Sequence, residues 1–153
     1  MEIKNNRDEE CCPEFDVQKW DRNHFKWDKK LFVKDRVFTF FFMPIGFGRT
    51  MKRIFNKMSD SGVESKDMMC LSHHTSRWNM DVYVDVEGEV QNAENIELSG
   101  QFYSRVYEGP YRDTQKWCDD FEADLEEQGK SLDQMYMWYA YCPRCAKKYA
   151  KNY

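Results

Sequence analysis

The spacing of hydrophobic positions changes several times along the chain, and each spacing predicts a different element. Residues 37–43 form a continuous apolar run, which is typical of a buried strand. Pro44 and Gly46 interrupt this run. Apolar side chains then recur at spacings of three and four over residues 47–58, which predicts a helix that ends at Gly62.

Two short strands are expected after this helix, at residues 68–72 and 80–86. The second strand alternates, which predicts one face turned inward and one turned outward. The inward residues are apolar and the outward ones mostly polar: Met80, Val82, Val84 and Val86 against Asp81, Tyr83 and Asp85.

The second half of the chain repeats this order of elements. Residues 101–107 predict a strand, and Gly109-Pro110 breaks it. A helix follows, ended by Gly129, and residues 135–142 predict another strand. The apolar stripe of the helix consists of Tyr111, Thr114, Cys118, Phe121 and Leu125.

A shift of 67 positions superposes the two halves. It places Gly62 on Gly129, Met51 on Cys118, Ile54 on Phe121, Met58 on Leu125 and Met68 on Met135. Agreement of a helix stripe, its stop and the next strand indicates a duplicated strand–helix–strand–strand unit. The expected fold is α+β, with the two units sharing one antiparallel sheet around a central ligand cleft and both helices on the far face.

This repeat also divides the chain. Residues 1–30 are expected to be an irregular N-terminal arm, and residues 31–153 a single domain. The first repeat covers about 31–95 and the second about 96–153. The second repeat has no equivalent of the strand at 80–86, so the last strand of the sheet is expected to be missing. An open sheet edge invites pairing, which predicts a homo-oligomer.

Composition narrows the function. The net charge of −4 without a basic stripe argues against nucleic-acid binding. No apolar run reaches the length of a membrane helix, and the charged start is unlike a signal peptide, so we expect a cytoplasmic protein with no membrane contact. Aromatic residues make up 16% of the chain, which suits either an aromatic core or an aromatic-lined pocket.

The segment Tyr107-Glu108-Gly109-Pro110-Tyr111, with its helix, Gly129 and the aromatic strand that follows, resembles the GyrI-like small-molecule-binding superfamily. The resemblance extends to a stand-alone bacterial branch that includes hydrolases opening the cyclopropane ring of DNA-alkylating natural products. It implies a ligand held between the two units and self-protection against such a compound. Drug-sensing relatives carry a pocket glutamate where this chain has Met137, so a cation site is not expected.

Two residues are candidates for hydrolytic chemistry. Glu108 lies where a strand meets the Gly-Pro turn, and a carboxyl group among aromatic rings can act as a general acid or base. The alternative is an ordinary exposed turn glutamate. Tyr139 is the second candidate, as a tyrosine that assists the attack of water.

Aromatic side chains are candidates for the wall of the pocket: Trp78, Tyr103, Tyr111, Tyr136 and Trp138. In a strand at 135–142, side chains alternate between two faces. Either Tyr136 and Trp138 or Met137 and Tyr139 would therefore face the ligand, and core packing is the alternative for each ring.

Cys142 and Cys145 are spaced as a metal-binding pair, and Cys11 and Cys12 bring the number of thiols to four. Adjacent cysteines are poorly placed to share one tetrahedral ion, so a zinc site, a redox pair and ordinary thiols all stay open. No phosphate-binding loop or nucleophile elbow occurs, and no cofactor is expected.

Three functions follow from these observations. The chain could bind a flat aromatic or hydrophobic small molecule, or it could also hydrolyse an electrophilic one. The third function is a non-catalytic protein-interaction module that acts through the acidic helix at residues 119–127, as in toxin-neutralising, gyrase-inhibitor-antagonist relatives.

Overall fold

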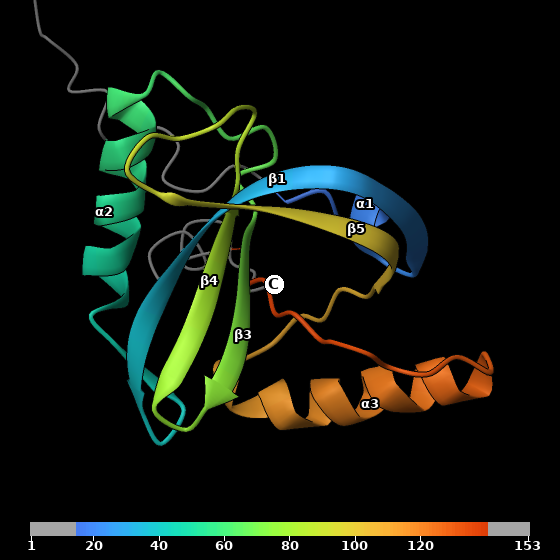
Figure 1. Cartoon of the computed structure of the whole chain (residues 1–153). Helices are drawn as coiled ribbons and strands as arrows, with labels where there is room; N and C mark the ends of the chain where they lie inside the picture. Colours follow the sequence, from blue (N-terminus) through green and yellow to red (C-terminus); the bar gives the residue numbers. More distant parts are fainter. Residues whose placement is uncertain (1–14, 141–153) are drawn as a thin grey trace, which may run out of the picture.

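The computed structural model describes residues 15–140, apart from the side chain of Tyr111. Figure 1 shows the order of the elements along the chain. They are α1 (Val17–Trp20), β1 (Asn23–Phe40), β2 (Met43–Ile45), α2 (Phe47–Asp60), β3 (Cys70–Ser76), β4 (Asn79–Asp85), β5 (Glu94–Ser104), the 3-10 helix η1 (Tyr111–Asp113) and α3 (Thr114–Glu127).

An antiparallel sheet of five strands forms the centre of the molecule, in the order β2-β1-β4-β3, with β5 also paired to β1. The long strand β1 organises this sheet because both of its edges are used. Phe32 pairs with Asp85 of β4 on one side and with Ile96 of β5 on the other. Since β5 belongs to the second half of the chain, the two halves share one open antiparallel sheet, and the predicted α+β fold class is confirmed.

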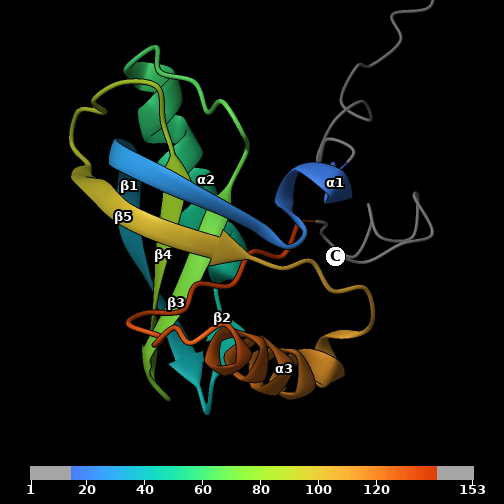
Figure 2. The same ribbon diagram turned by 90° about the vertical axis from the view of Figure 1, so that its right-hand side faces the viewer.

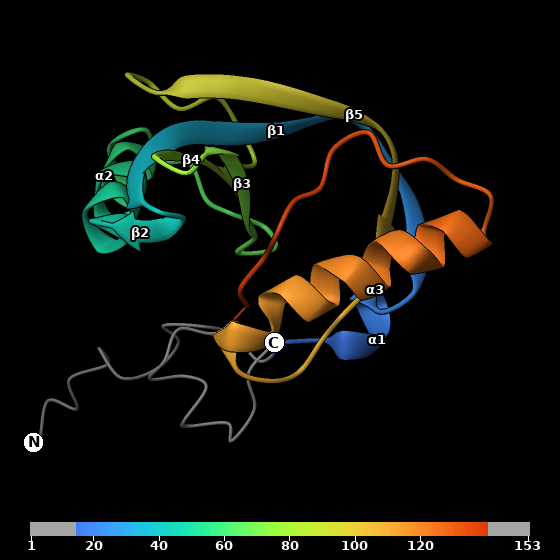
Figure 3. The ribbon, with the colours of Figure 1, turned by 90° about the horizontal axis from the view of Figure 1, so that it is seen from below.

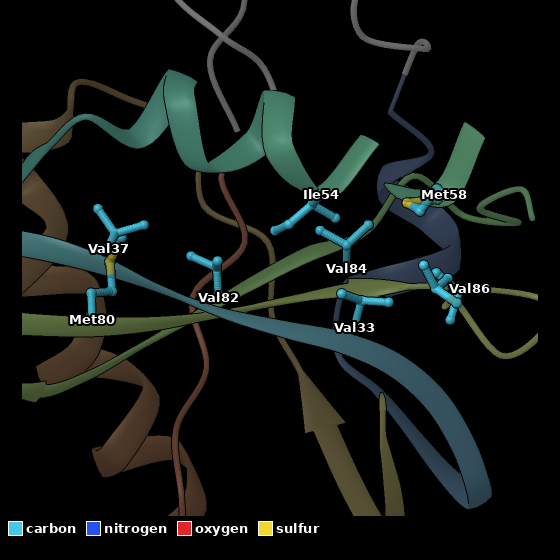
Figure 4. Packing of buried hydrophobic residues seen from close by; sticks show 9 residues of the cluster. Val33, Val37, Ile54, Met58, Met80, Val82, Val84 and Val86 are labelled. Atoms are coloured by element: carbon cyan, nitrogen blue, oxygen red, sulfur yellow. The ribbon is translucent and has the colours of Figure 1, made fainter. Parts of the chain in front are cut away.

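Helix α2 covers one face of the sheet, as Figure 4 shows. Ile54 and Met58 of α2 are buried against Val33 of β1 and Val82 and Val84 of β4. These are positions that the helical and alternating patterns predict to face inward. Burial of such side chains stabilises the fold by roughly 1.5–3 kcal/mol each, so this layer is a main source of stability.

The opposite face of β4 is buried as well, which corrects the expectation of an outward polar face. Tyr83 is 7% exposed and Asp85 only 1%. The carboxylate of Asp85 accepts hydrogen bonds from Ser65 Oγ at 2.6 Å and from the backbone N–H groups of Asp67 at 2.9 Å and Met69 at 2.7 Å. Three donors replace the lost water, so the alternation in sequence marked two environments but not which of them was solvated.

The apolar run at residues 37–43 is not one buried strand. It contains the end of β1, a two-residue turn and the start of β2. Within it Val37 and Thr39 are buried. Large apolar side chains along residues 38–55 are instead exposed: Phe38, Phe40, Phe41, Phe42, Met43, Ile45, Phe47 and Phe55. Strand propensity was sound here, but burial required a covering layer that the described chain does not provide.

Residues 23–30, expected to belong to an irregular arm, form the first part of β1. A bulge between Trp27 and Lys30 bends this part, where Trp27 pairs with Gly100 and Lys30 with Leu98. The bulge contains one extra residue and therefore reverses the alternation of faces. This reversal explains why no single period is visible in the sequence of β1.

The second unit departs further from its prediction. Helix α3 and its stop at Gly129 (φ +70°) are confirmed, whereas β5 begins seven residues before the predicted strand at 101–107. Residues 135–140 make a single antiparallel bridge, between Met137 and Ser72, in place of the predicted strand; residues 141 and 142 lie outside the described part.

The two larger helices do not share the far face of the sheet. Helix α2 lies on one side, and α3 lies across the molecule beneath the curled end of β1 and β5, as Figures 2 and 3 show. In the described part of the chain, no helix is long and apolar enough to span a bilayer.

Candidate functional site

A pocket of about 1120 Å³ lies between the curled ends of β1 and β5, helix α3 and the segment 129–139. Met69 and Leu71 of the sheet line its floor, on the side opposite α2. Helix α3 contributes Trp117, Cys118, Phe121 and Leu125 to the lining. A volume of this size is typical of sites for drug-sized organic molecules.

Aromatic rings form most of one wall. Trp27 and Phe102 lie 4.4 Å apart between ring centroids, and Phe25 stacks on Phe102 at 5.8 Å with an interplanar angle of 11°. Phe25 and Phe102 are direct partners across β1 and β5, so antiparallel pairing itself places the two rings together. Trp20 continues the wall and meets Trp138 edge to face at 5.4 Å.

A network of charged and phenolic groups joins β5 to α3 at another part of the pocket. Arg105 Nη1 lies 2.8 Å from Asp120 Oδ2 and 3.4 Å from Asp124 Oδ2. Tyr103 donates to Asp124 at 2.5 Å, and Tyr107 donates to Asp120 at 2.7 Å. The two aspartates are four residues apart on α3 and therefore lie on one helical face, where a single guanidinium can reach both.

One nitrogen of this network is left without a partner. The side chain of Arg105 is only 14% exposed, and its Nε is buried with no hydrogen-bond acceptor among the described residues. A buried donor without a partner costs free energy that an incoming acceptor would recover. Arg105 also lines the pocket, so this N–H can serve a ligand oxygen.

His24 provides a second donor on the pocket wall. Its ring stacks on Tyr103 at 4.5 Å, and Lys130 Nζ lies 3.2 Å from its Nδ1. A lysine ammonium only donates, so Nδ1 accepts and Nε2 carries the proton of the neutral ring. In this state His24 acts as a hydrogen-bond donor and not as a general base.

Comparison with protein families matches residues 2–153 to a family described as bacterial hydrolase. The chain belongs to this family. The match includes all of the elements that line the pocket. Comparisons with curated proteins and with solved structures give no match.

The cysteines of the described chain are unsuited to nucleophilic attack. Burial, together with the negative charges of Glu122 and Asp119, raises the pKa of Cys118, which lines the pocket. Burial and the charge of Asp85 raise the pKa of Cys70 to about 12. Both groups are thiols at neutral pH, and the thiol is a poor nucleophile compared with the thiolate.

The structure brings four of the predicted site residues into the pocket lining: Tyr103, Tyr136, Trp138 and Tyr139. Tyr136 and Tyr139 were placed on alternative faces, but both line the pocket because residues 135–140 do not form a strand. Met137 lines it too.

Other predicted residues lie elsewhere. Trp78 is in the β3–β4 turn against Phe40 and Phe41, and it does not line the pocket. Glu108 is exposed and is also outside the lining. Tyr111 begins η1, but its side chain is outside the description.

Sequence reasoning missed the wall made by Trp20, Phe25, Trp27 and Phe102, and it missed Arg105. Alternation of polar and aromatic residues at His24-Phe25-Lys26-Trp27 was the available signal for a strand with one aromatic face. Nothing in the sequence places Arg105 near the two aspartates of α3, because that proximity depends on the packing of the helix.

No cluster of ligating side chains suited to a metal ion occurs within residues 15–140. The four cysteines named as zinc candidates, Cys11, Cys12, Cys142 and Cys145, lie outside the described residues. Zinc binding by these residues therefore stays a prediction.

Proposed function

We propose that the protein binds a flat aromatic or hydrophobic small molecule in this pocket and hydrolyses an electrophilic bond within it. The observation that carries the proposal is the buried, unpartnered Nε of Arg105 beside an aromatic wall. Membership of a bacterial hydrolase family supports the hydrolytic part. The resemblance to GyrI-like proteins supports the choice of a small-molecule ligand.

Binding would rest on ring stacking and apolar burial. Trp27, Phe102 and Trp138 offer aromatic surface to a planar ligand. Stacked or edge-to-face ring pairs contribute about 0.5–1.5 kcal/mol beyond the area they bury. Several such pairs therefore favour a planar compound over an aliphatic one of the same size.

The chemistry would rest on charge stabilisation by two donors, Arg105 Nε and His24 Nε2. A hydrogen bond to a carbonyl oxygen conjugated with the reactive carbon draws electrons toward that oxygen and favours attack by water. For a cyclopropane-type substrate, water forms a C–O bond as one ring C–C bond breaks. The electron pair of that bond moves to the conjugated oxygen, which ends protonated, and water supplies both protons of the product.

Glu108 and Tyr139 were the residues predicted to move protons. Tyr139 lines the pocket, whereas Glu108 is exposed and outside it. The proposal therefore assigns charge stabilisation to Arg105 and keeps Tyr139 as the group that positions water. Glu108→Gln tests whether the turn glutamate has any part.

Turnover of a cyclopropane-containing alkylating compound, followed by mass spectrometry of the hydrated product, tests the proposal. Arg105→Lys keeps a charge but loses the planar donor fork, and we expect kcat to fall by roughly 100-fold with a small change in KM. Trp138→Ala should instead raise KM. Trp78→Ala, outside the pocket, is the matched control for loss of a tryptophan.

The outcomes separate the parts of the proposal. Product formed by the natural chain and lost in Arg105→Lys supports hydrolysis. Stoichiometric retention of the unchanged compound, weakened by Trp138→Ala, leaves binding and removes hydrolysis. Neither product nor retention overturns the proposal for this class of compound.

The alternative function, protein interaction through the acidic helix, draws less support from the structure. Two of the acidic side chains of α3, Asp120 and Asp124, are engaged with Arg105, Tyr103 and Tyr107. Asp119, Glu122 and Glu126 are exposed, but no observation connects them to a partner.

A further inference from the structure

Exposed apolar side chains are concentrated at one end of the molecule. Within residues 38–55, eight large apolar side chains are between 37% and 68% exposed. They lie on the β1–β2 hairpin and the first half of α2, at the lower left of Figure 1. Soluble proteins seldom gather so many exposed apolar groups in one place unless that surface makes contact with something.

The turn of this hairpin has an unusual sequence. Its two residues are Phe41 and Phe42, with φ of +47° and +69°. A two-residue turn with both φ values positive is normally built from Asn-Gly, because bulky side chains are strained in this region. Both rings are 57% exposed, so the core gains little from them. Two phenylalanines at strained, solvent-facing positions indicate a role beyond folding.

The neighbouring β3–β4 turn braces the hairpin. Phe42 N–H donates to the carbonyl of Arg77 at 3.0 Å, and Thr39 N–H donates to that of Trp78 at 2.8 Å. The ring of Trp78 lies 5.0 Å from that of Phe41 and is 40% exposed. We call the surface formed by Phe40, Phe41, Phe42, Met43 and Trp78 the aromatic tip. Its backbone is fixed by these bonds, so it projects as a rigid wedge.

Positive charge is concentrated around this tip. Residues 36–59 include five basic side chains, Arg36, Arg49, Lys52, Arg53 and Lys57, and no acidic one. The rest of the chain therefore has 18 of the 23 basic residues and all 27 acidic ones. The protein thus combines a cationic end with a strongly anionic remainder.

Several of these cations are available to a partner. Arg53 pairs with Asp35 at 2.8 Å. By contrast, no ion pair among residues 15–140 involves Arg49, Lys52 or Arg77, and all three are exposed. Exposed aromatic groups with a cationic rim match the chemistry of an anionic lipid interface, where rings enter the headgroup boundary and lysine and arginine meet phosphate.

We propose that the aromatic tip docks this protein on the surface of an anionic phospholipid bilayer. The sequence excluded a spanning helix, and surface docking requires none. The rings of the tip insert at the boundary between headgroups and acyl chains, while Arg49, Lys52 and Arg77 contact lipid phosphates. The inference is independent of the pocket and of any hydrolysis there.

A second copy of the chain is a poorer occupant of the tip. Pro44 lies in the middle of β2 and has no N–H to donate, which hinders strand addition at that edge. Two copies meeting through their tips would also bring their cationic rims together, and like charges repel. Both features favour lipid over self-association.

Co-sedimentation with vesicles tests the proposal. We expect the natural chain to bind vesicles of phosphatidylcholine mixed with phosphatidylglycerol and not vesicles of phosphatidylcholine alone. The variant Phe41→Asn with Phe42→Gly should lose binding, although its turn sequence is better suited to the backbone. Met68→Asn is the matched control, since Met68 is also apolar, 41% exposed and at positive φ (+50°), but precedes β3 at the end away from the tip.

The charge requirement has its own pair of variants. Arg49→Gln with Lys52→Gln should lower the partition coefficient into anionic vesicles by roughly 30-fold. Lys29→Gln with Lys66→Gln removes two exposed charges away from the tip and should leave binding almost unchanged. Added salt should weaken binding of the natural chain, because exposed charges are screened.

Several results would overturn the proposal. No binding to anionic vesicles does so directly, as does equal binding to both vesicle types or binding that survives the tip variant. Self-association in solution that the tip variant abolishes, without vesicle binding, would assign the tip to a second copy. Thermal unfolding of each variant confirms that a loss of binding is not a loss of fold.

Discussion

Tyr103 on β5 donates a hydrogen bond of 2.5 Å to Asp124 on α3. Burial and this bond raise the pKa of Tyr103, and the bond lowers the pKa of Asp124, so the phenol stays protonated and the carboxylate ionised at neutral pH. The sheet and α3 share few other polar contacts beyond the Arg105 and Tyr107 groups. This bond therefore sets the position of α3 over the pocket.

Tyr103→Phe should loosen α3. Because the phenol is partly buried and its acceptor is charged, we expect amide hydrogen exchange in α3 to become roughly tenfold faster. Tyr107→Phe is the matched control: it removes a bond to Asp120 that is exposed, and the effect should be smaller. Equal effects of the two substitutions would contradict the assignment.

Gly109→Ala should destabilise the protein by about 1–2 kcal/mol. Gly109 has φ +150°, and a methyl group there would lie 3.3 Å from the Trp117 ring and 3.6 Å from Asp113. Since Trp117 lines the pocket, ligand affinity should fall too. Gly48→Ala is the control, because that site in α2 is open and alanine should stabilise the helix by about 0.5–1 kcal/mol. Urea unfolding measures both effects, and a neutral Gly109→Ala would refute the steric argument.

The tip variant, Phe41→Asn with Phe42→Gly, should be more stable than the natural chain. Each bulky residue in the left-handed region costs about 1–2 kcal/mol. Loss of the ring contacts to Trp78 and His74 returns about 0.5–1.5 kcal/mol each. We expect a net gain of roughly 1 kcal/mol in the free energy of unfolding. A clear loss of stability would show that the rings serve the fold.

The ion pair between Asp35 and Arg53 should make stability depend on pH in acid. Burial alone would raise the pKa of Asp35, but the hydrogen bonds from Arg53 and from the Arg36 N–H outweigh it and hold the pKa below its usual value of 3.8. A lowered pKa means that the contribution is fully present above about pH 4 and is lost as pH falls through the folded-state pKa.

Asp35→Asn removes this contribution. It should lower the free energy of unfolding by about 1 kcal/mol at neutral pH and by less at the acid end, so the two stability curves converge as pH falls. Asp28→Asn, at an exposed position of β1 without an ion pair among the described residues, should run parallel to the natural chain. Curves for Asp35→Asn that stay parallel would contradict the pairing.

Much of the sheet and its α2 layer was readable from the sequence, because burial there follows local period. Ile54 and Met58 recur at helical spacing, and Val82 and Val84 alternate along β4. The pocket wall was harder to predict. Trp138 and Tyr136 were found as aromatic candidates, but Trp27 and Phe102 come from strands whose pairing is interrupted by a bulge.

The sequence by itself determined the order of elements, the fold class and the end of each long helix, since these depend on neighbours within a few residues. Tertiary structure alone decided which apolar residues were covered. Phe41 and Phe42 lie in an apolar run yet face solvent, while Asp85 is buried because three donors converge on it. Burial depends on what the rest of the chain packs against a residue, and no local pattern contains that information.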